Sequence, residues 1–337
     1  MELAPTPKDT LFRDGTAALY RFRRPEDAPP AAPGAMPLLL VPSMINRWYV
    51  LDLRRGASMA DALVRAGIDT FCLDWGIPED EDRYLGWDEV IARLSRMVRR
   101  VKRETGAPKV GVLGYCMGAT ISSVYSALEP ESVAALVNLA GPIDFSKAGF
   151  LGDMVDARFF DAQAIGDAGN MSPQMMQQGF VALRPTAQIA KWVGFLDRAH
   201  DPKARESFEA LEAWAGDNIP FPGAAYTTYI GDLYQKNALV KGQHHVRGKR
   251  ADLKNIRCPV LTVVADRDSI CPPLAATALN ENVSSTDKEV LTVAGGHVGA
   301  VVGGKAPKVL YPALAAWFNK HLSPPPVRVH TEMVAEA

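Results

Sequence analysis

The segment Gly114–Gly118, Gly-Tyr-Cys-Met-Gly, constrains this chain more than any other feature. It follows an apolar run over 109–113 and precedes a small-residue stretch, 119–128, that favours a helix. A strand that turns sharply into a helix forces the residue at the turn into strained backbone angles, and bulky neighbours two residues away would collide with it. The two glycines therefore predict such a turn with Cys116 at its tip. The sulfur would stand at a helix N-terminus, whose dipole favours a thiolate.

A cysteine between packing glycines can also be a buried structural residue, so the motif needs support from elsewhere in the chain. An apolar strand over 259–265 runs into an acidic loop that contains Asp268. A second predicted strand, 290–294, leads into the glycine-flanked His297. The order nucleophile, acid, histidine, each after a predicted strand, is the order found in α/β-hydrolases. We predict that Cys116, His297 and Asp268 form a catalytic constellation.

Two other aspartates compete with Asp268 for the acid position. Asp266 lies two residues nearer the strand, and Asp144 follows an earlier predicted strand, where some hydrolases place their acid. Aspartates just after strands often cap turns, and we expect that role for both. Asp268 adjoins the Pro272-Pro273 turn and is the favoured acid.

Composition excludes several classes of protein. The 337 residues carry a net charge of −1, so nothing indicates a nucleic-acid partner or a polybasic membrane anchor. No apolar run approaches the roughly 20 residues that span a bilayer, and residues 1–9 lack the pattern of a signal peptide. The four cysteines, Cys72, Cys116, Cys258 and Cys271, have no metal-ligand spacing and predict reduced thiols in a cytoplasmic protein without a metal or cofactor.

Strand and helix patterns alternate along most of the chain and predict an α/β fold with a doubly wound, mostly parallel sheet. The alternation breaks after Phe145 and resumes at Cys258, with helical patterns and no clear strand between them. An insertion at that point would cover the strand ends where α/β sheets bind ligands. The expected organisation is a peripheral segment 1–36, a core of 37–145 and 254–322, a helical cap 146–253 and a disordered tail 323–337.

Apolar residues of the predicted cap allow two interpretations. Met171, Met175 and Met176 could line an acyl-binding tunnel, although apolar residues at helical spacing are more often simple core. Cys271, beside the acid loop, could similarly line the site or merely pack.

Four stretches together resemble the polyhydroxyalkanoate synthases, specifically the catalytic subunit of the two-subunit, class III enzymes: 40–47, 72–78, 114–118 and 294–299. The resemblance extends from about Tyr20 to Leu322. It implies a cysteine acyltransferase that polymerises 3-hydroxyacyl-CoA, by default 3-hydroxybutyryl-CoA, into polyester and releases CoA. Carried onto this chain, the family's nucleophile, aspartate and histidine fall on Cys116, Asp268 and His297. One departure is Ser269, where other synthases often have histidine.

The resemblance also implies partners and a location. Class III catalytic subunits work with a second, non-homologous subunit, and synthases tend to form dimers, so a homodimer or hetero-oligomer is expected. Acyl-CoA is the expected substrate and the polyester the product, with the enzyme in the cytoplasm, on the surface of a polyester granule.

The expected chemistry begins with His297 taking the proton of Cys116, because the thiolate is the nucleophile. Backbone N–H groups of Met117 and of the loop residues Met44 and Ile45 would receive the oxyanion. Asp268 would either orient His297 or help to deprotonate the incoming hydroxyl. The alternative functions are a hydrolase of the same fold, either a polyester depolymerase or an acyl-CoA thioesterase, and a non-catalytic companion subunit.

Overall fold

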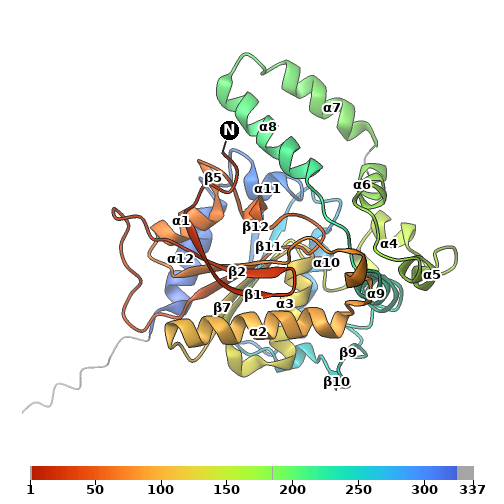
Figure 1. The fold of residues 1–337 in the computed structure, drawn as a ribbon, viewed down its shortest axis with the longest axis horizontal. Helices are drawn as coiled ribbons and strands as arrows, with labels where there is room; N and C mark the ends of the chain where they lie inside the picture. The colour runs from red at the N-terminus through yellow and green to blue at the C-terminus, as the bar shows by residue number, and fades with distance from the viewer. Residues whose placement is uncertain (1, 184, 325–337) are drawn as a thin grey trace, which may run out of the picture.

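An eight-stranded sheet forms the centre of the structure, a computed structural model that describes residues 2–183 and 185–324 (Figure 1). Its strands, in spatial order, are β1 (Lys8–Asp14), β2 (Ala17–Phe22), β6 (Thr70–Asp74), β3 (Leu38–Val41), β7 (Val110–Tyr115), β8 (Val133–Leu139), β11 (Val260–Ala265) and β12 (Lys288–Val293). From β6 to β12 all neighbours are parallel. The central strands are buried on both faces, which explains their continuous apolar sequences. The predicted sheet is therefore confirmed.

Strands β1 and β2 lie in the segment that the sequence analysis set aside as peripheral. β2 pairs antiparallel with β6, and β1 pairs antiparallel with β2, so together they extend the edge of the sheet. Ala17 and Leu19 are fully buried and belong to the core. The sequence analysis missed both strands, because β1 is largely polar and an antiparallel hairpin falls outside the strand–helix alternation used to find the others.

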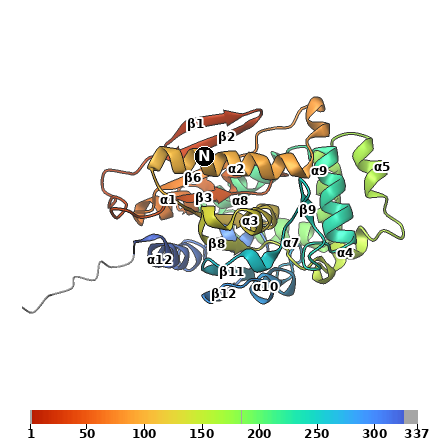
Figure 2. The same ribbon diagram turned by 90° about the horizontal axis from the view of Figure 1, so that it is seen from below.

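Helices cover both faces of the sheet (Figure 2). One apolar core contains residues of α2 (Trp87–Thr105), α3 (Met117–Leu128) and α10 (Pro273–Asn282). The core on the other face contains residues of α1 (Met59–Arg65), α11 (Gly299–Val302) and α12 (Leu310–Leu322). Helix α2 shows how the sequence directs this packing. Its buried residues recur every three or four positions and form one apolar stripe: Trp87, Val90, Ile91, Leu94, Met97, Val98 and Val101.

The segment between β8 and β11 is mainly helical, as expected. It contains α4 (Phe150–Met154), α5 (Ala162–Asp167), α6 (Pro173–Ala182), α7 (Pro185–Leu196), α8 (Pro202–Gly216), α9 (Gly223–Thr228) and a π-helix (Tyr229–Gln235). In both views α4, α5 and α9 lie at the same side of the sheet, while α7 and α8 extend outward as a pair in Figure 1. The sequence analysis found no strand here, but β9 (His245–Val246) and β10 (Lys249–Arg250) form a two-residue ladder.

Three other expectations concern membrane-spanning helices, disulfides and the C-terminal tail. In the described part of the chain, no helix has both the length and the apolarity needed to cross a membrane. All four cysteines are described and none is in a disulfide. Of the tail expected to be disordered, residues 325–337 lie outside the described residues.

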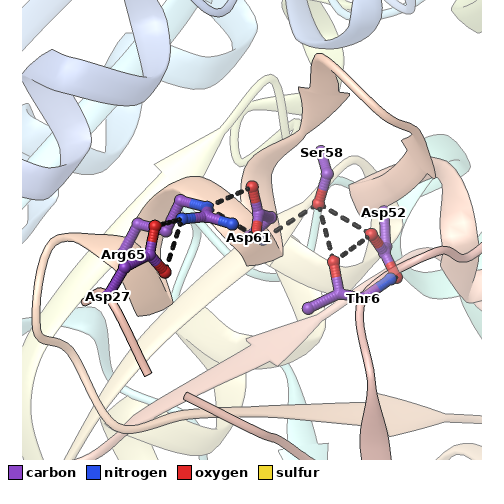
Figure 3. A network of polar contacts seen from close by, with 6 residues as sticks. All are labelled: Thr6, Asp27, Asp52, Ser58, Asp61 and Arg65. Atoms are coloured by element: carbon purple, nitrogen blue, oxygen red, sulfur yellow. Dashed lines mark hydrogen bonds and ion pairs between the residues drawn. The ribbon is translucent and has the colours of Figure 1, made fainter. Parts of the chain in front are cut away.

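A buried carboxylate ties the N-terminus to the core (Figure 3). Asp52 begins β4 (Asp52–Arg54) and is fully buried. Burial raises its pKa, and hydrogen bonds that favour the charged form oppose this effect. Its oxygens accept hydrogen bonds from the Thr6 amide at 3.1 Å, the Thr6 hydroxyl at 2.6 Å and the Ser58 hydroxyl at 2.7 Å. Ser58 also caps α1 by accepting the Asp61 N–H at 2.9 Å.

We expect Thr6→Val to destabilise the protein through this contact. The valine keeps the shape of the side chain but leaves a buried carboxylate without one of its donors, which costs about 2 kcal/mol. Thr10→Val on the exposed part of β1 is the matched control and should change the free energy of unfolding by less than about 0.5 kcal/mol. Urea denaturation of both variants measures the difference, and equal effects would contradict the account.

Candidate active site

Cys116 stands at the sharp turn between β7 and α3, as the glycine spacing predicts. Its backbone angles, φ 56° and ψ −129°, lie in a region that non-glycine residues rarely adopt, at a cost of about 1–3 kcal/mol. The Cys116 amide donates to the carbonyl of Leu139 at 2.9 Å, which fixes the turn to β8. A Cβ atom at Gly118 would collide with the carbonyl oxygen of Val41 on β3, so only glycine allows this approach.

His297 and Asp268 come together beside Cys116, on the loops that follow β12 and β11. Nδ1 of His297 lies 2.6 Å from Oδ2 of Asp268. The other oxygen of Asp268 accepts the N–H groups of Ile270 and Cys271, both at 2.9 Å, so the carboxylate is held from both sides. Asp268 and His297 are only 6% and 8% exposed, which protects their contact from competing water.

The other two candidate acids make turn contacts instead. Asp266 accepts the Gly295 N–H at 2.8 Å, which fixes the loop that carries His297. Asp144 caps a 3₁₀-helix by accepting the Ser146 N–H, and it pairs with Lys147 at 3.3 Å. The structure thus brings Asp268 rather than Asp266 or Asp144 against His297.

The electrostatics of this site favour an imidazolium. Burial by itself would lower the pKa of His297, but the negative charge of a Cys116 thiolate and the hydrogen bond that Nδ1 donates to Asp268 raise it to about 10. Nε2 of His297 is buried and makes no hydrogen bond of good geometry with any described residue. Contacts between a nucleophile and its base are often loose in the free enzyme and tighten when substrate binds, so the arrangement still suits a Cys–His pair.

The raised pKa of His297 leads to a pH prediction. Because the pKa lies near 10 rather than 6.5, the imidazolium persists through neutral pH and loses its proton only as the pH rises through about 10. Iodoacetate is an anion, so its attack on Cys116 is helped by the imidazolium, whereas neutral iodoacetamide is not helped. We expect the iodoacetate-to-iodoacetamide rate ratio at Cys116 to fall about tenfold around pH 10, an effect of the size that loss of a nearby charge has in a partly buried site.

Peptide mass spectrometry can follow alkylation of Cys116 separately from the other cysteines. The His297→Gln variant should lack the fall in the rate ratio. A fall near pH 6.5 in the wild-type protein would mean that Cys116 and Asp268 do not raise the histidine pKa.

The three expected oxyanion donors remain a prediction, and their positions in the structure suit this role to different degrees. Met117 is the first residue of α3, so its N–H lies at the helix N-terminus directly after the nucleophile. Ile45 lines the same cavity as Cys116, and its N–H faces the Ser43 hydroxyl at 3.4 Å, a long hydrogen bond that an oxyanion could displace. Met44 is buried but is not among the described residues that line this cavity.

An apolar cavity of about 280 Å³ lies between Cys116 and the predicted cap. From the core side its lining includes Ile45, Met117, Pro142, Ile270 and Cys271. From the cap side it includes Met171, Met175, Met176, Phe180, Phe221, Tyr226, Tyr229 and Tyr234. The three methionines and Cys271 thus line the cavity, which is the interpretation that the sequence analysis favoured less.

The cavity's aromatic wall was missed by the sequence analysis. Tyr229 and Tyr234 are five residues apart, and on an α-helix they would point in widely different directions. The π-helix places their rings 5.5 Å apart in an edge-to-face pair beside the cavity. Periodicity at 3.6 residues gives no signal for such a pair.

One group of described residues has the composition of a metal site, away from Cys116. Asp287, Glu289 and His321 offer ligand atoms within 4.8 Å of one another. Lys320 Nζ lies 3.4 Å from Glu289, so this carboxylate already has a cationic partner. We assign the group no part in the chemistry.

Comparisons with known proteins agree with the fold. The family model of the alpha/beta hydrolase fold matches residues 37–303. Among solved structures, a soluble variant of monoglyceride lipase from Saccharomyces cerevisiae superposes with a TM-score of 0.57 at 15% identity, covering 94% of this chain and 96% of that one. The fold, with a cysteine at its nucleophile turn and an Asp–His pair beside it, defines an α/β-hydrolase-fold protein.

Relatives in sequence identify the family within this fold class. The poly(3-hydroxyalkanoate) polymerase subunit PhaC of Allochromatium vinosum is 35% identical over 94% of this chain and 89% of its own length. The subunits of the same name from Thiocystis violacea and Synechocystis sp. are 32% and 30% identical, each over 94% of this chain and over 88% and 85% of their own lengths. The chain belongs to the poly(3-hydroxyalkanoate) polymerase family.

Proposed function

We propose that this protein polymerises 3-hydroxyacyl-CoA, with 3-hydroxybutyryl-CoA as the first candidate, into a polyester carried on Cys116. The observation that supports the proposal is a cysteine at the strand-to-helix turn, with His297 held by Asp268 at 2.6 Å, lining an apolar cavity in a chain of the polymerase family. The reaction uses no cofactor, because thioester exchange and ester formation need only proton transfer.

The first half of the reaction loads the enzyme. In the free enzyme His297 Nε2 already holds the proton of the Cys116 thiol, and the resulting thiolate attacks the carbonyl carbon of the acyl-CoA thioester. The N–H groups of Met117 and Ile45 are the proposed donors to the oxyanion, and loss of one such donor typically costs ~10²–10³-fold in rate. The carbon–sulfur bond to CoA breaks, the imidazolium returns its proton to the CoA sulfur, and the acyl group remains on Cys116 as a thioester.

The second half extends the chain. The 3-hydroxyl of another acyl unit gives its proton to His297 and attacks the thioester on Cys116. An ester bond forms, the carbon–sulfur bond breaks, and the thiolate is regenerated beside the imidazolium. A thioester keeps the acyl group activated toward an alcohol, whereas a serine ester would lose that activation. In this scheme Asp268 orients His297, because both of its oxygens are already engaged in the free protein.

The apolar cavity supports polymerisation over hydrolysis. Its lining of methionine, phenylalanine and tyrosine side chains suits an acyl chain and disfavours water, which would otherwise release the acyl group as a free acid. The relatives that match most of the chain are named polymerases, which favours the same choice. A thioesterase or polyester depolymerase is therefore the second candidate.

Partners and location complete the proposal. The relatives are named subunits, which supports a second polypeptide in the active assembly. We propose a hetero-oligomer or homodimer that works in the cytoplasm, at the surface of the polyester it makes.

Butyryl-CoA, which lacks the 3-hydroxyl, separates the two candidate functions. It can load Cys116 but has no nucleophile to continue, so a polymerase should release about one CoA per Cys116 and then stop. A thioesterase would continue to release CoA at a steady rate, and that result would reject polymerisation. 3-Hydroxybutyryl-CoA in a parallel reaction should give continuous CoA release with insoluble polyester rather than free 3-hydroxybutyrate.

A further inference from the structure

Tyr115, the residue before the nucleophile, packs against the ring of His297. The two ring centroids are 5.4 Å apart with an interplanar angle of 27°, so the rings are stacked. Tyr115 is 2% exposed and His297 is 8% exposed, so water cannot replace this contact on that face of the imidazole. The phenol hydroxyl also faces the backbone carbonyl of His297 at 3.5 Å, at the outer limit of a hydrogen bond.

The position of the Tyr115 ring is set by the centre of the sheet. Tyr115 is the last residue of β7 and pairs with Leu139 on β8. Cys116 follows immediately in its strained turn, so one dipeptide supplies both the nucleophile and the surface on which the histidine lies. His297, in contrast, belongs to a loop opened by Gly295, whose φ of +140° requires glycine, and such a loop needs external contacts to fix a side chain.

The two contacts of the His297 ring, with Asp268 and with Tyr115, restrict different properties of it: the tautomer and the orientation. Asp268 holds Nδ1 and therefore fixes the tautomer, but a single hydrogen bond leaves the ring free to rotate about that contact. Tyr115 lies against the face of the ring and restricts this rotation. The face of a tyrosine ring carries negative electrostatic potential, and a cation within about 6 Å of it is stabilised by about 0.5–2 kcal/mol.

We propose that Tyr115 is a positioning residue that holds His297 over its aromatic face and stabilises the imidazolium formed when Cys116 is ionised. This role goes beyond the polymerase activity and rests on the assignment of Cys116 and His297 as nucleophile and base in the proposed function. The titratable groups that act on His297 are Cys116 and Asp268, and both also act on the buried phenol of Tyr115.

The test changes the charge of the aromatic face while keeping its shape. Tyr115→Phe retains the negative face, and replacement of Tyr115 by pentafluorophenylalanine reverses it in a ring of nearly the same size. The readout is the pH at which the iodoacetate-to-iodoacetamide rate ratio at Cys116 falls, since this pH reports loss of the imidazolium proton. We expect pentafluorophenylalanine to lower the pH of this fall by about one unit relative to phenylalanine, which corresponds to a tenfold change in the acidity of His297.

Steady-state kinetics provide a second readout for the same pair. The fluorinated variant should lose about tenfold in kcat with KM changed less than twofold, because His297 acts on the reacting sulfur and not on substrate binding. The same phenylalanine and pentafluorophenylalanine pair at Tyr125, a buried residue of α3 away from His297, is the matched control and should alter neither value.

Two results would overturn the proposal. If the rate ratio falls at the same pH in the phenylalanine and pentafluorophenylalanine variants, the aromatic face does not stabilise the imidazolium. Tyr115 would then be only a core residue. If Tyr115→Phe alone lowers that pH by a full unit, the hydroxyl contact carries the effect instead. Tyr115→Leu, which removes the ring, must lower the pH by about one unit if the proposal holds, and it supplies the answer if the fluorinated protein does not fold. The alkylation assay needs no acyl substrate, so failure of this proposal is distinguishable from failure of the polymerase assignment.

Discussion

Cys116→Ala should abolish CoA release from 3-hydroxybutyryl-CoA, with a loss of at least about 10⁴-fold, because the acyl chain is carried on Cys116 in the proposed reaction. The protein should remain folded. Alanine can occupy the same backbone conformation at a comparable cost, and the thiol is only partly buried. Thermal unfolding checks the fold, and a thiol-reactive dye reports CoA release.

Cys271→Ala is the matched control for this experiment. Cys271 lines the same cavity, but its buried thiol has a pKa raised well above the ordinary value, because burial disfavours the thiolate. Its removal should change turnover by less than about threefold. Turnover by Cys116→Ala at the wild-type rate would reject the nucleophile assignment, and loss of turnover only in Cys271→Ala would move the nucleophile to that cysteine.

Asp268→Asn should lower kcat by about 10³–10⁴-fold with a small change in KM. The asparagine amide would face Nδ1 of His297 where the structure has a carboxylate oxygen at 2.6 Å, and it can hold the wrong tautomer of the imidazole. In catalytic triads the corresponding exchange has an effect of this size. The variant should also move the fall in the iodoacetate rate ratio to a lower pH, because the imidazolium loses its carboxylate partner but keeps the Cys116 thiolate.

Asp266→Asn is the matched control for Asp268→Asn. Asp266 lies on the same loop, yet its contact is the Gly295 N–H at 2.8 Å, which an asparagine oxygen can still accept. We expect less than a threefold change in kcat. Equal losses in the two variants would show that the loop, rather than the Asp268 carboxylate, limits turnover.

Most of the parallel half of the fold could be predicted because its inner strands are continuous apolar runs. β3, β7 and β11 are buried on both faces, which leaves an unambiguous signal in their sequences. β1 gives no such signal, because it is a sheet edge with polar side chains and is held by pairing with β2 and by the contact between Thr6 and Asp52.

In the active site, too, some residues could be predicted from the sequence and others could not. Cys116 could be placed because the turn needs glycine at Gly114 and Gly118, and the choice of Asp268 agreed with its contact to His297. The cavity walls could not be placed. The spacing of Tyr229 and Tyr234 has meaning only in a π-helix, and the stacking of Tyr115 on His297 joins residues 182 positions apart along the chain.

Mass spectrometry of the peptide that contains Cys116, after an acid quench during turnover of 3-hydroxybutyryl-CoA, tests the central claim most directly. A polymerase that grows its product on this cysteine should give a ladder of Cys116 peptides, separated by the mass of one 3-hydroxybutyryl unit. Hydroxylamine should remove the ladder, because it cleaves thioesters. An unmodified Cys116 peptide during continuing CoA release, or a single acyl unit that never extends while free 3-hydroxybutyrate accumulates, would contradict the account.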